Sequence, residues 1–201
     1  MNSNFWDERY GSEAFAYGRD PNGFLREEAH RIPKGRVLCL AEGEGRNAVF
    51  LALRGHAVTA VDFSAAGLRK AERLARENGV SIDTVQANLA TYDLEQDAFS
   101  AVVSIFAHLP PAVRVRVHAQ IPGALVKGGI LVLEAYTPRQ LAHGTGGPRD
   151  PEWLMTLEGV TNELGGSLAV QVGREVEREI HEGAFHTGTG ATVQLVAARA
   201  T

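Results

Sequence analysis

The sequence has few of the residues that mark secreted, nucleic-acid-binding or membrane proteins. Its single cysteine, Cys39, cannot form an internal disulfide. Lysine occurs only three times among the 20 basic residues, and the formal net charge is −4, which disfavours binding to nucleic acid. No apolar run reaches the roughly 20 residues that span a bilayer. Met1 is followed by polar Asn2–Ser3–Asn4 instead of a basic and apolar leader, so we expect no signal peptide and a cytoplasmic location.

The composition is that of an ordinary globular chain. Hydrophobic residues make up 44% of the 201 residues and charged residues 22%. A chain of this length fits one domain, which we assign to residues 1–201, and it can bury a full core without metals or disulfides. We find no internal repeat and no low-complexity tract.

Short apolar runs alternate with amphipathic segments over most of the chain. Residues 1–20 form an arm of aromatic and charged groups, and a helix begins at Asp20–Pro21 and ends near Pro33. Beyond it, we expect strands at 36–40, 57–61, 82–86, 101–106 and 130–135, with helices at 46–54, from Ser64 to Asn78 and after Pro110–Pro111. This alternation predicts a parallel sheet covered on both faces.

The C-terminal third has a different pattern. Residues 143–151 are rich in glycine and proline and predict a loop, and residues 152–164 predict a helix. Two strand-like runs, 168–180 and 192–199, flank a glycine-rich turn, so we expect them to pair antiparallel. Charges alternate along the first run from Arg174 to Glu179, which indicates a solvated face.

The most informative segment is a strand, a glycine turn and a helix start at Val37–Asn47. Gly43 and Gly45 let the backbone approach a ligand closely, and the following helix offers free N–H groups. About twenty residues later, Asp62 ends the second strand, where a carboxylate can accept hydrogen bonds from ribose hydroxyls. The alternative is that this loop is only a tight turn.

The charge of this loop separates two cofactors. Glu42 and Glu44 would repel a pyrophosphate at the helix N-terminus. S-adenosylmethionine (SAM) carries no phosphate but does carry a sulfonium and an ammonium. The sequence therefore favours SAM over NAD.

Several motifs together resemble one family. The chain looks like the tellurite-resistance and thiopurine branch of class I SAM methyltransferases, especially a bacterial subgroup with the loop Leu-Ala-Glu-Gly-Glu-Gly-Arg-Asn-Ala. The resemblance covers nearly the whole chain and rests on the motifs Trp6-Asp-Glu-Arg-Tyr10, Tyr17-Gly-Arg-Asp-Pro-Asn22, the glycine loop, Val61-Asp-Phe-Ser64, Ser104-Ile-Phe-Ala-His-Leu109 and Lys127-Gly-Gly129.

The resemblance implies an α/β fold: a Rossmann-like three-layer sandwich whose seven-stranded, mainly parallel sheet has the order 3-2-1-4-5-7-6 with an antiparallel C-terminal pair. Residues 1–34 would form a lid, 35–135 the cofactor-binding core and 136–201 the substrate loop, a helix and the last strands. The SAM-contacting residues it implies, by position in this sequence, are Tyr17 and Arg19 from the arm; Ala41, Glu42, Gly43 and Asn47 from the glycine loop; Asp62 and Phe63; Asn88 and Leu89; and Ser104 and Phe106.

Two positions depart from the family pattern. Cys39 stands where the family usually has aspartate, and Ala41 stands where it has glycine. The aspartate normally orders the loop and helps to bind the ammonium. Glu42 or Glu44 is the candidate to supply that charge here.

Candidate residues for the chemistry follow the later strands. His108 lies after the fourth strand and is our candidate base, the alternative being a loop histidine bonded to backbone. Glu134 and Tyr136 end the fifth strand and either contact the acceptor or cap the strand. His181 and His186 flank Glu182 at a spacing that fits no standard zinc pattern, so we predict no metal site.

The sequence therefore predicts an enzyme that transfers a methyl group from SAM to a small-molecule acceptor such as a thiol or a metalloid oxyanion. Neither a nucleic acid nor a membrane is expected as a partner. A non-catalytic SAM-binding protein shares every cofactor motif and stays as an alternative. An NAD(P)-dependent oxidoreductase is a weaker one, because the loop is acidic and no Tyr-x-x-x-Lys pair is present.

Overall fold

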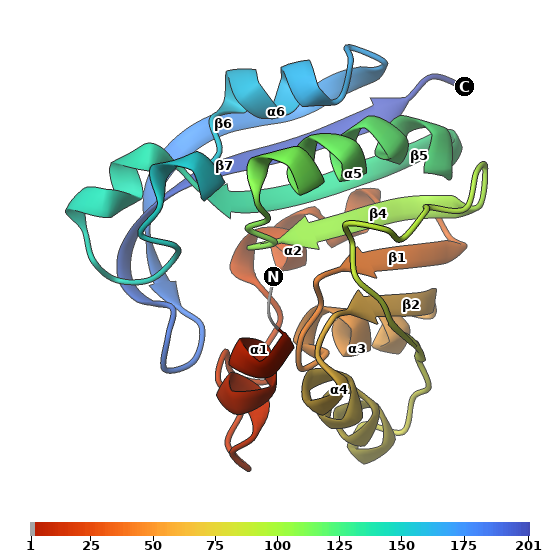
Figure 1. Ribbon diagram of the computed structural model, residues 1–201. Helices are drawn as coiled ribbons and strands as arrows, with labels where there is room; N and C mark the ends of the chain where they lie inside the picture. The colour runs from red at the N-terminus through yellow and green to blue at the C-terminus, as the bar shows by residue number, and fades with distance from the viewer. Residues whose placement is uncertain (1–2) are drawn as a thin grey trace.

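The protein is built around one seven-stranded sheet with helices on both faces (Figure 1). The computed structural model describes residues 3–201. The strands are β1 (Arg36–Leu40), β2 (Ala57–Asp62), β3 (Asp83–Gln86), β4 (Phe99–Ile105), β5 (Leu125–Tyr136), β6 (Leu168–His181) and β7 (Thr187–Arg199). The α-helices are α1 (Ser3–Tyr10), α2 (Gly23–Glu28), α3 (Arg46–Leu53), α4 (Ala65–Glu77), α5 (Pro111–Ala124) and α6 (Leu157–Glu163).

The strand order is β3-β2-β1-β4-β5-β7-β6, as predicted. The first five strands are parallel, and β7 runs antiparallel between β5 and β6. The order reverses next to β1, so the carboxyl ends of β1 and β4 flank a crevice where open α/β sheets bind their ligands. The predicted fold class, with its antiparallel C-terminal pair, is confirmed.

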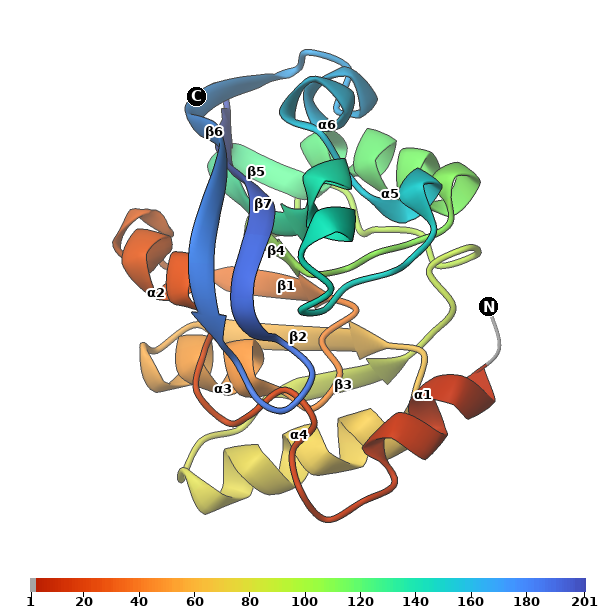
Figure 2. The same cartoon turned by 90° about the vertical axis from the view of Figure 1, so that its left-hand side faces the viewer.

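Two apolar layers fill the space between sheet and helices. On one face, Val117 and Ile121 of α5 and Val160 of α6 pack on buried residues such as Leu38 and Leu131. On the other face, Leu25 of α2, Leu51 of α3 and Leu68 of α4 pack on buried strand residues such as Cys39 of β1 and Val103 of β4. Figure 2 shows α2 and α3 on one side of the sheet and α5 and α6 on the other. Cys39 is thus a core residue of this face.

Local signals explain where most helices begin and end. In α4, the Ser64 side chain accepts the Gly67 N–H, and Gly79 follows the helix with a φ of +70° that suits glycine. The helix predicted to begin at Asp20–Pro21 begins instead at Gly23, because the Asn22 side chain caps it by accepting the Leu25 N–H. It ends at Glu28, and a 3₁₀ turn (Ala29–Arg31) continues toward Pro33.

Three boundaries of the C-terminal half were predicted wrongly. The helix expected over 152–164 divides into a 3₁₀ turn (Pro151–Trp153) and α6, because Thr156 caps α6 and Leu154 and Met155 are drawn into the core. Strand β5 starts at Leu125 rather than Ile130. Strand β7 starts at Thr187, since Gly188 and Gly190 are part of the ladder with β6 instead of a turn.

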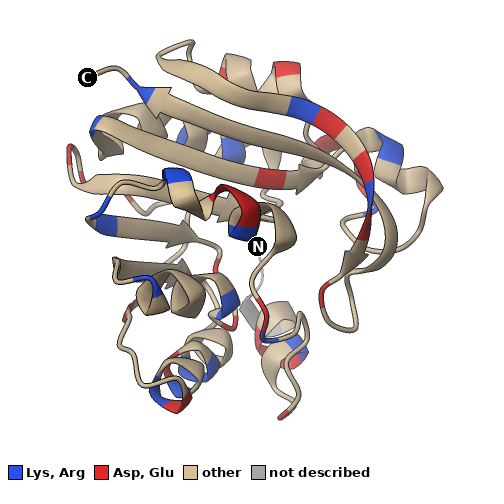
Figure 3. Cartoon of the chain, turned by 180° about the vertical axis from the view of Figure 1, so that it is seen from behind, with Lys and Arg blue, Asp and Glu red and all other residues tan. Residues whose placement is uncertain are grey.

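Strand β6 forms the edge of the sheet and alternates in charge, which Figure 3 shows as red and blue bands along it. Most of its side chains are exposed, but Arg178 turns inward toward β5. A further 3₁₀ turn (Pro138–Ala142) follows β5. Within residues 3–201, no helix is both long and apolar enough to cross a membrane.

Candidate functional site

A cavity of ≈ 610 Å³ opens at the carboxyl ends of β1, β2 and β4. Its size lies within the roughly 300–1,000 Å³ of small-molecule sites. Helix α1, the loop over 146–148 and the β6–β7 hairpin complete its walls. The predicted site residues that line it are Tyr17, Ala41, Glu42, Asn47, Asp62, Phe63, Asn88, Leu89, Phe106 and His108.

Three predicted SAM contacts do not line this cavity. Arg19 points away from it, because its guanidinium pairs with Glu77 and lies 5.2 Å from the centre of the Phe15 ring; its side chain is 53% exposed. Gly43 is covered by the Tyr10 hydroxyl, and Ser104 is buried within β4. The SAM contacts of Arg19, Gly43 and Ser104 therefore stay predictions, and in this structure none of the three lines the cavity.

The Glu42 side chain occupies the N-terminus of α3. Its Oε1 accepts the N–H groups of Asn47 at 2.9 Å and Ala48 at 2.8 Å. Burial raises the pKa of Glu42 to about 7, although these N–H groups oppose the shift. The donors that would bind a pyrophosphate in a dinucleotide fold are therefore already used by a carboxyl group of the protein.

Asp62 ties the end of β2 to the glycine loop. Its Oδ2 accepts the Gly43 N–H and its Oδ1 the Ser64 N–H, each at 2.8 Å. Burial raises the pKa of Asp62 above its usual value. Each carboxylate oxygen has a second lone pair, so Asp62 can also accept hydrogen bonds from a ligand in the cavity.

Glu44 does not supply a free charge to the cavity. Its carboxylate pairs with the buried Lys70 ammonium and receives the Tyr17 N–H. Lys70 also donates to the carbonyl oxygens of Ser12 and Ala14, so the pair fixes the arm against α4. Of the two loop glutamates, only Glu42 lines the cavity without a cationic side chain paired to it among residues 3–201.

Two cavity residues adopt a left-handed backbone that disfavours side chains. Ala41 has φ of +49° directly after β1, and Phe106 has φ of +52° directly after β4. Such conformations cost energy and persist where the surrounding structure enforces them, often at ligand sites. Here they turn both loops sharply at the crevice.

His108 is held in the wall of the cavity by the backbone. Its Nε2 accepts the Tyr136 N–H at 2.9 Å, which selects the tautomer with hydrogen on Nδ1. Burial lowers the pKa of His108 to about 4. The geometry therefore favours a hydrogen-bond donor over the base that the sequence suggested, and it matches the alternative of a histidine bonded to backbone.

Helix α1 covers the cavity and supplies residues that we did not assign individually from the sequence. Trp6 stacks on Tyr10, with ring centres 5.6 Å apart, and Tyr10 meets Tyr17 edge-on. Arg9 donates to the Tyr17 hydroxyl and lies 4.0 Å from the centre of the Phe185 ring. The aromatic pattern of residues 5–10 is visible in the sequence. The residues that this segment contacts in the fold, such as Phe185, are distant along the chain and could not be predicted from it.

The β6–β7 hairpin brings His186 to the cavity. Its ring lies 4.5 Å from that of Phe106 and 4.6 Å from that of Tyr17, measured between centres. Burial, followed by the nearby charge of Arg46, lowers the pKa of His186 to about 3. His181, the other histidine of this segment, is exposed and lies outside the cavity, and residues 3–201 contain no acidic, histidine or cysteine cluster that could hold a metal.

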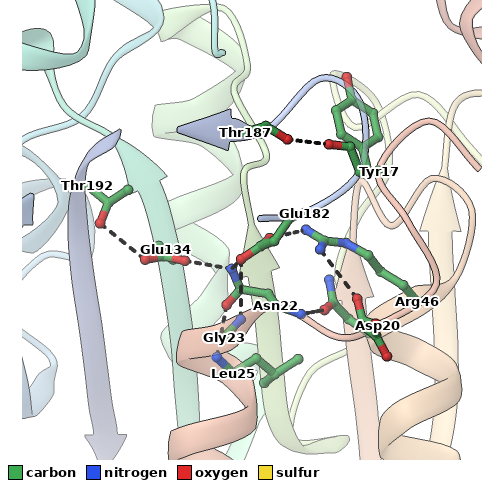
Figure 4. Close-up of polar contacts among 12 residues, drawn as sticks. Tyr17, Asp20, Asn22, Gly23, Leu25, Arg46, Glu134, Glu182, Thr187 and Thr192 are labelled. Carbon is green, nitrogen blue, oxygen red and sulfur yellow. Dashed lines mark hydrogen bonds and ion pairs between the residues drawn. The ribbon is translucent and has the colours of Figure 1, made fainter. Parts of the chain in front are cut away.

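A buried polar network connects this hairpin to the core (Figure 4). Glu182 receives hydrogen bonds from Arg46 at 2.6 Å, Arg178 at 3.0 Å and Asn22 at 3.0 Å. Glu134, fully buried at the end of β5, binds Arg178 and Asn22. Burial alone would raise the pKa of Glu182, but the charges of Arg46 and Arg178 outweigh it and lower the pKa to about 2. The Glu134 carboxylate is therefore engaged by this network, and Glu134 does not line the cavity.

The comparisons agree with this architecture. Residues 37–129 match the family model described as a methyltransferase domain, a little under half of the chain. No curated protein matches the sequence.

Among solved structures, the chain is similar to one from work on the conversion of a disulfide bond into a thioacetal group during echinomycin biosynthesis (TM-score 0.78, 17% identity, covering 98% of this chain and 91% of that one). A SAM-dependent methyltransferase from Methanosarcina mazei has a TM-score of 0.71 at 17% identity, covering 90% of this chain and 99% of that one. TehB from Haemophilus influenzae has a TM-score of 0.68 at 16% identity, covering 98% of this chain and 66% of that one. At these identities the likeness establishes the methyltransferase Rossmann-like fold.

Proposed function

We propose that the protein is a SAM-dependent methyltransferase that acts on a small-molecule acceptor. The observation that carries this proposal is the cavity at the carboxyl ends of β1, β2 and β4, in which Glu42 occupies the α3 N-terminus. This arrangement leaves no phosphate site but keeps acidic groups beside the cavity, which fits a cationic nucleoside better than a dinucleotide.

The lining residues match the parts of SAM. Asp62 would hold the ribose hydroxyls, with Phe63, Asn88 and Leu89 around the adenine. The methionine part would lie beside Ala41 and Asn47. Its carboxylate would meet Arg9, which lines the cavity and pairs with no carboxylate among residues 3–201. SAM supplies an electrophilic methyl group on its sulfonium.

The protein's contribution would be alignment and exclusion of water. Trp6, Tyr10 and Tyr17 cover the cavity from the arm, and Phe106 enters it from the end of β4. Holding donor and acceptor in line replaces an encounter in solution with a reaction inside one complex, which alone lowers a barrier substantially. The acceptor classes implied by the resemblance are a thiol, a metalloid oxyanion or a similar small nucleophile.

Turnover separates an enzyme from a non-catalytic SAM-binding protein. Purified protein would be incubated with methyl-labelled SAM and pools of small thiols, hydroxyl compounds, amines and tellurite, and S-adenosylhomocysteine would be quantified. We expect its release to depend on one pool and to be lost in Asp62→Ala, with the exposed Asp93→Ala as control. SAM binding without release from any pool would favour the non-catalytic alternative, and binding of NADH instead of SAM would favour the oxidoreductase.

A further inference from the structure

The two oxygens of the Glu42 carboxyl group have different surroundings. Oε1 accepts the N–H groups of Asn47 and Ala48 at the start of α3. Oε2 has no hydrogen-bond partner among residues 3–201, and it is not closed off from solvent. Since Glu42 lines the cavity, Oε2 is the oxygen that a bound ligand can reach.

The cations of the elements around Glu42 are engaged with other groups. Arg46, in the first turn of α3, pairs with Glu182 at 2.6 Å. Lys70 of α4 pairs with Glu44, the other glutamate of the loop. Because no cationic side chain among residues 3–201 pairs with Glu42, a positively charged ligand group is the natural partner for its free oxygen.

The other titratable groups around Glu42 and the cavity are acidic or uncharged, apart from Arg9. Arg9 of α1 donates to the Tyr17 hydroxyl and, in the proposed function, meets the SAM carboxylate. Asp62, at the end of β2, adds a second acidic group beside Glu42. The remaining groups are Tyr10, Tyr17, Cys39, His108 and His186. Burial keeps all five neutral between pH 6 and pH 8, because it raises the pKa values of the tyrosines and of Cys39 and lowers those of the histidines to about 4 and about 3.

Glu42 itself changes charge near neutral pH. Burial raises its pKa to about 7, because the N–H groups of α3 and the charge of Arg46 offset only part of the burial. A cation beside Oε2 would favour the ionised form and lower the pKa again. A ligand that brings such a cation must therefore displace the proton, and it binds more tightly as the pH rises until Glu42 is already ionised.

We propose that the protein takes up its cofactor with release of the Glu42 proton to the solvent, after which Oε2 pairs with a positive charge of the bound nucleoside. This inference rests on the proposed function and adds a regulation of the same site. SAM offers two positive charges, the ammonium of its methionine part and the sulfonium, whereas S-adenosylhomocysteine keeps only the ammonium. At limiting SAM, occupancy of the cavity would thus respond to pH around neutrality.

Calorimetric titration in buffers of different ionisation enthalpy counts the released protons, since each proton that the buffer takes up adds the enthalpy of that buffer. The ligands would be SAM, S-adenosylhomocysteine and 5′-methylthioadenosine, which carries neither positive charge. Given the Glu42 pKa of about 7, SAM should release about one proton at pH 6 and almost none at pH 8, and should bind about tenfold more tightly at pH 8. The same release with S-adenosylhomocysteine would assign the pairing to the ammonium, and release with SAM alone would assign it to the sulfonium. Binding of 5′-methylthioadenosine should release no proton.

Glu42→Gln keeps an acceptor for the α3 N–H groups but cannot ionise, so its binding of SAM should release no proton and should not change between pH 6 and pH 8. Glu158→Gln, at an exposed position of α6, is the matched control and should release protons as the wild type does. Binding of SAM to the wild type at pH 6 without proton release, equal release in Glu42→Gln, or equal release by 5′-methylthioadenosine would overturn the inference. Failure of the wild type to bind SAM or S-adenosylhomocysteine at either pH would instead overturn the proposed function, and this inference with it.

Discussion

Ala41 occupies a backbone conformation that its side chain disfavours. Its φ of +49° lies in the left-handed region, where glycine has no steric penalty. Ala41→Gly should therefore stabilise the protein by about 0.5–1 kcal/mol, the relieved strain being offset in part by the greater freedom of glycine in the unfolded chain.

Urea unfolding measures this change. Ala52→Gly, inside α3, is the matched control and should destabilise the protein by about 1 kcal/mol because glycine is a poor helix former. Loss of stability in Ala41→Gly would mean that the loop does not strain this residue.

His186 should make the fold sensitive to acid. Burial lowers its pKa from 6.5 to about 3, so between these values the unfolded chain binds a proton that the folded protein does not. Stability due to this group is complete above pH 6.5 and is lost as pH falls toward 3, by about 2 kcal/mol between pH 7 and pH 5.

The pH dependence of urea unfolding in wild type and His186→Phe isolates this effect. Glu42 acts in the opposite direction between pH 4.5 and 7, since its pKa is raised, but it is present in both proteins and cancels in the difference. The variant should lose about 2 kcal/mol less than the wild type, and His181→Phe should behave as the wild type. Equal slopes for His186→Phe and the wild type would show that the imidazole is accessible to water.

For single residues, the sequence was sufficient to locate those that follow strand ends. It was not sufficient for cavity residues that come from segments distant along the chain. Ala41, Asp62 and Phe106 follow strands, so topology alone places them at the crevice. Arg9 and His186 reach it through α1 and a hairpin whose docking depends on long-range packing. The direction of the Arg19 side chain could not be predicted for the same reason, because its partner Glu77 lies 58 positions away along the chain.

Among the elements, the β6–β7 hairpin depends most on buried charge. Arg46, Arg178, Glu134 and Glu182 form a balanced set that connects it to α3 and β5. Glu182→Met would leave two arginines facing a single carboxylate and should destabilise the protein by about 3 kcal/mol.

A double-mutant cycle provides the control. Arg46→Met combined with Glu182→Met removes both members of one pair, so the double variant should be more stable than Glu182→Met alone. Additive losses in urea unfolding would show that the two side chains do not interact. The interaction was hidden from sequence reading, since Arg178 belongs to a segment whose alternating charges predict a solvated face.

Elements with complete local signals were predicted well. Helix α4 has an N-cap, an apolar stripe and a terminal Asn78–Gly79, and its observed bounds differ from the prediction by one residue at each end. By contrast, no such signal marks the helix start that we predicted at Glu152. Leu154 and Met155 are buried in the core there, and α6 begins only after them. Tertiary packing decides boundaries that local chemistry leaves open.

For the whole molecule, the alternation of strands and helices was sufficient to predict a parallel sheet, and the resemblance supplied its order. The acidic loop indicated SAM before any geometry was known. The structure adds the physical reason: Glu42 itself uses the α3 N–H groups that a pyrophosphate would need. What topology could not give is the wall of the cavity that helix α1, the loop over 146–148 and the β6–β7 hairpin supply, because only the folded chain brings these segments together.

The most direct test of this account is calorimetric titration of the wild type and Asp62→Ala with S-adenosylhomocysteine, with NADH as the comparison ligand. Micromolar binding of S-adenosylhomocysteine, weakened by at least about tenfold in Asp62→Ala and unchanged in the exposed Asp93→Ala, is the predicted result. No binding to a folded wild type, or binding that does not depend on Asp62, would contradict the assignment of this cavity to SAM.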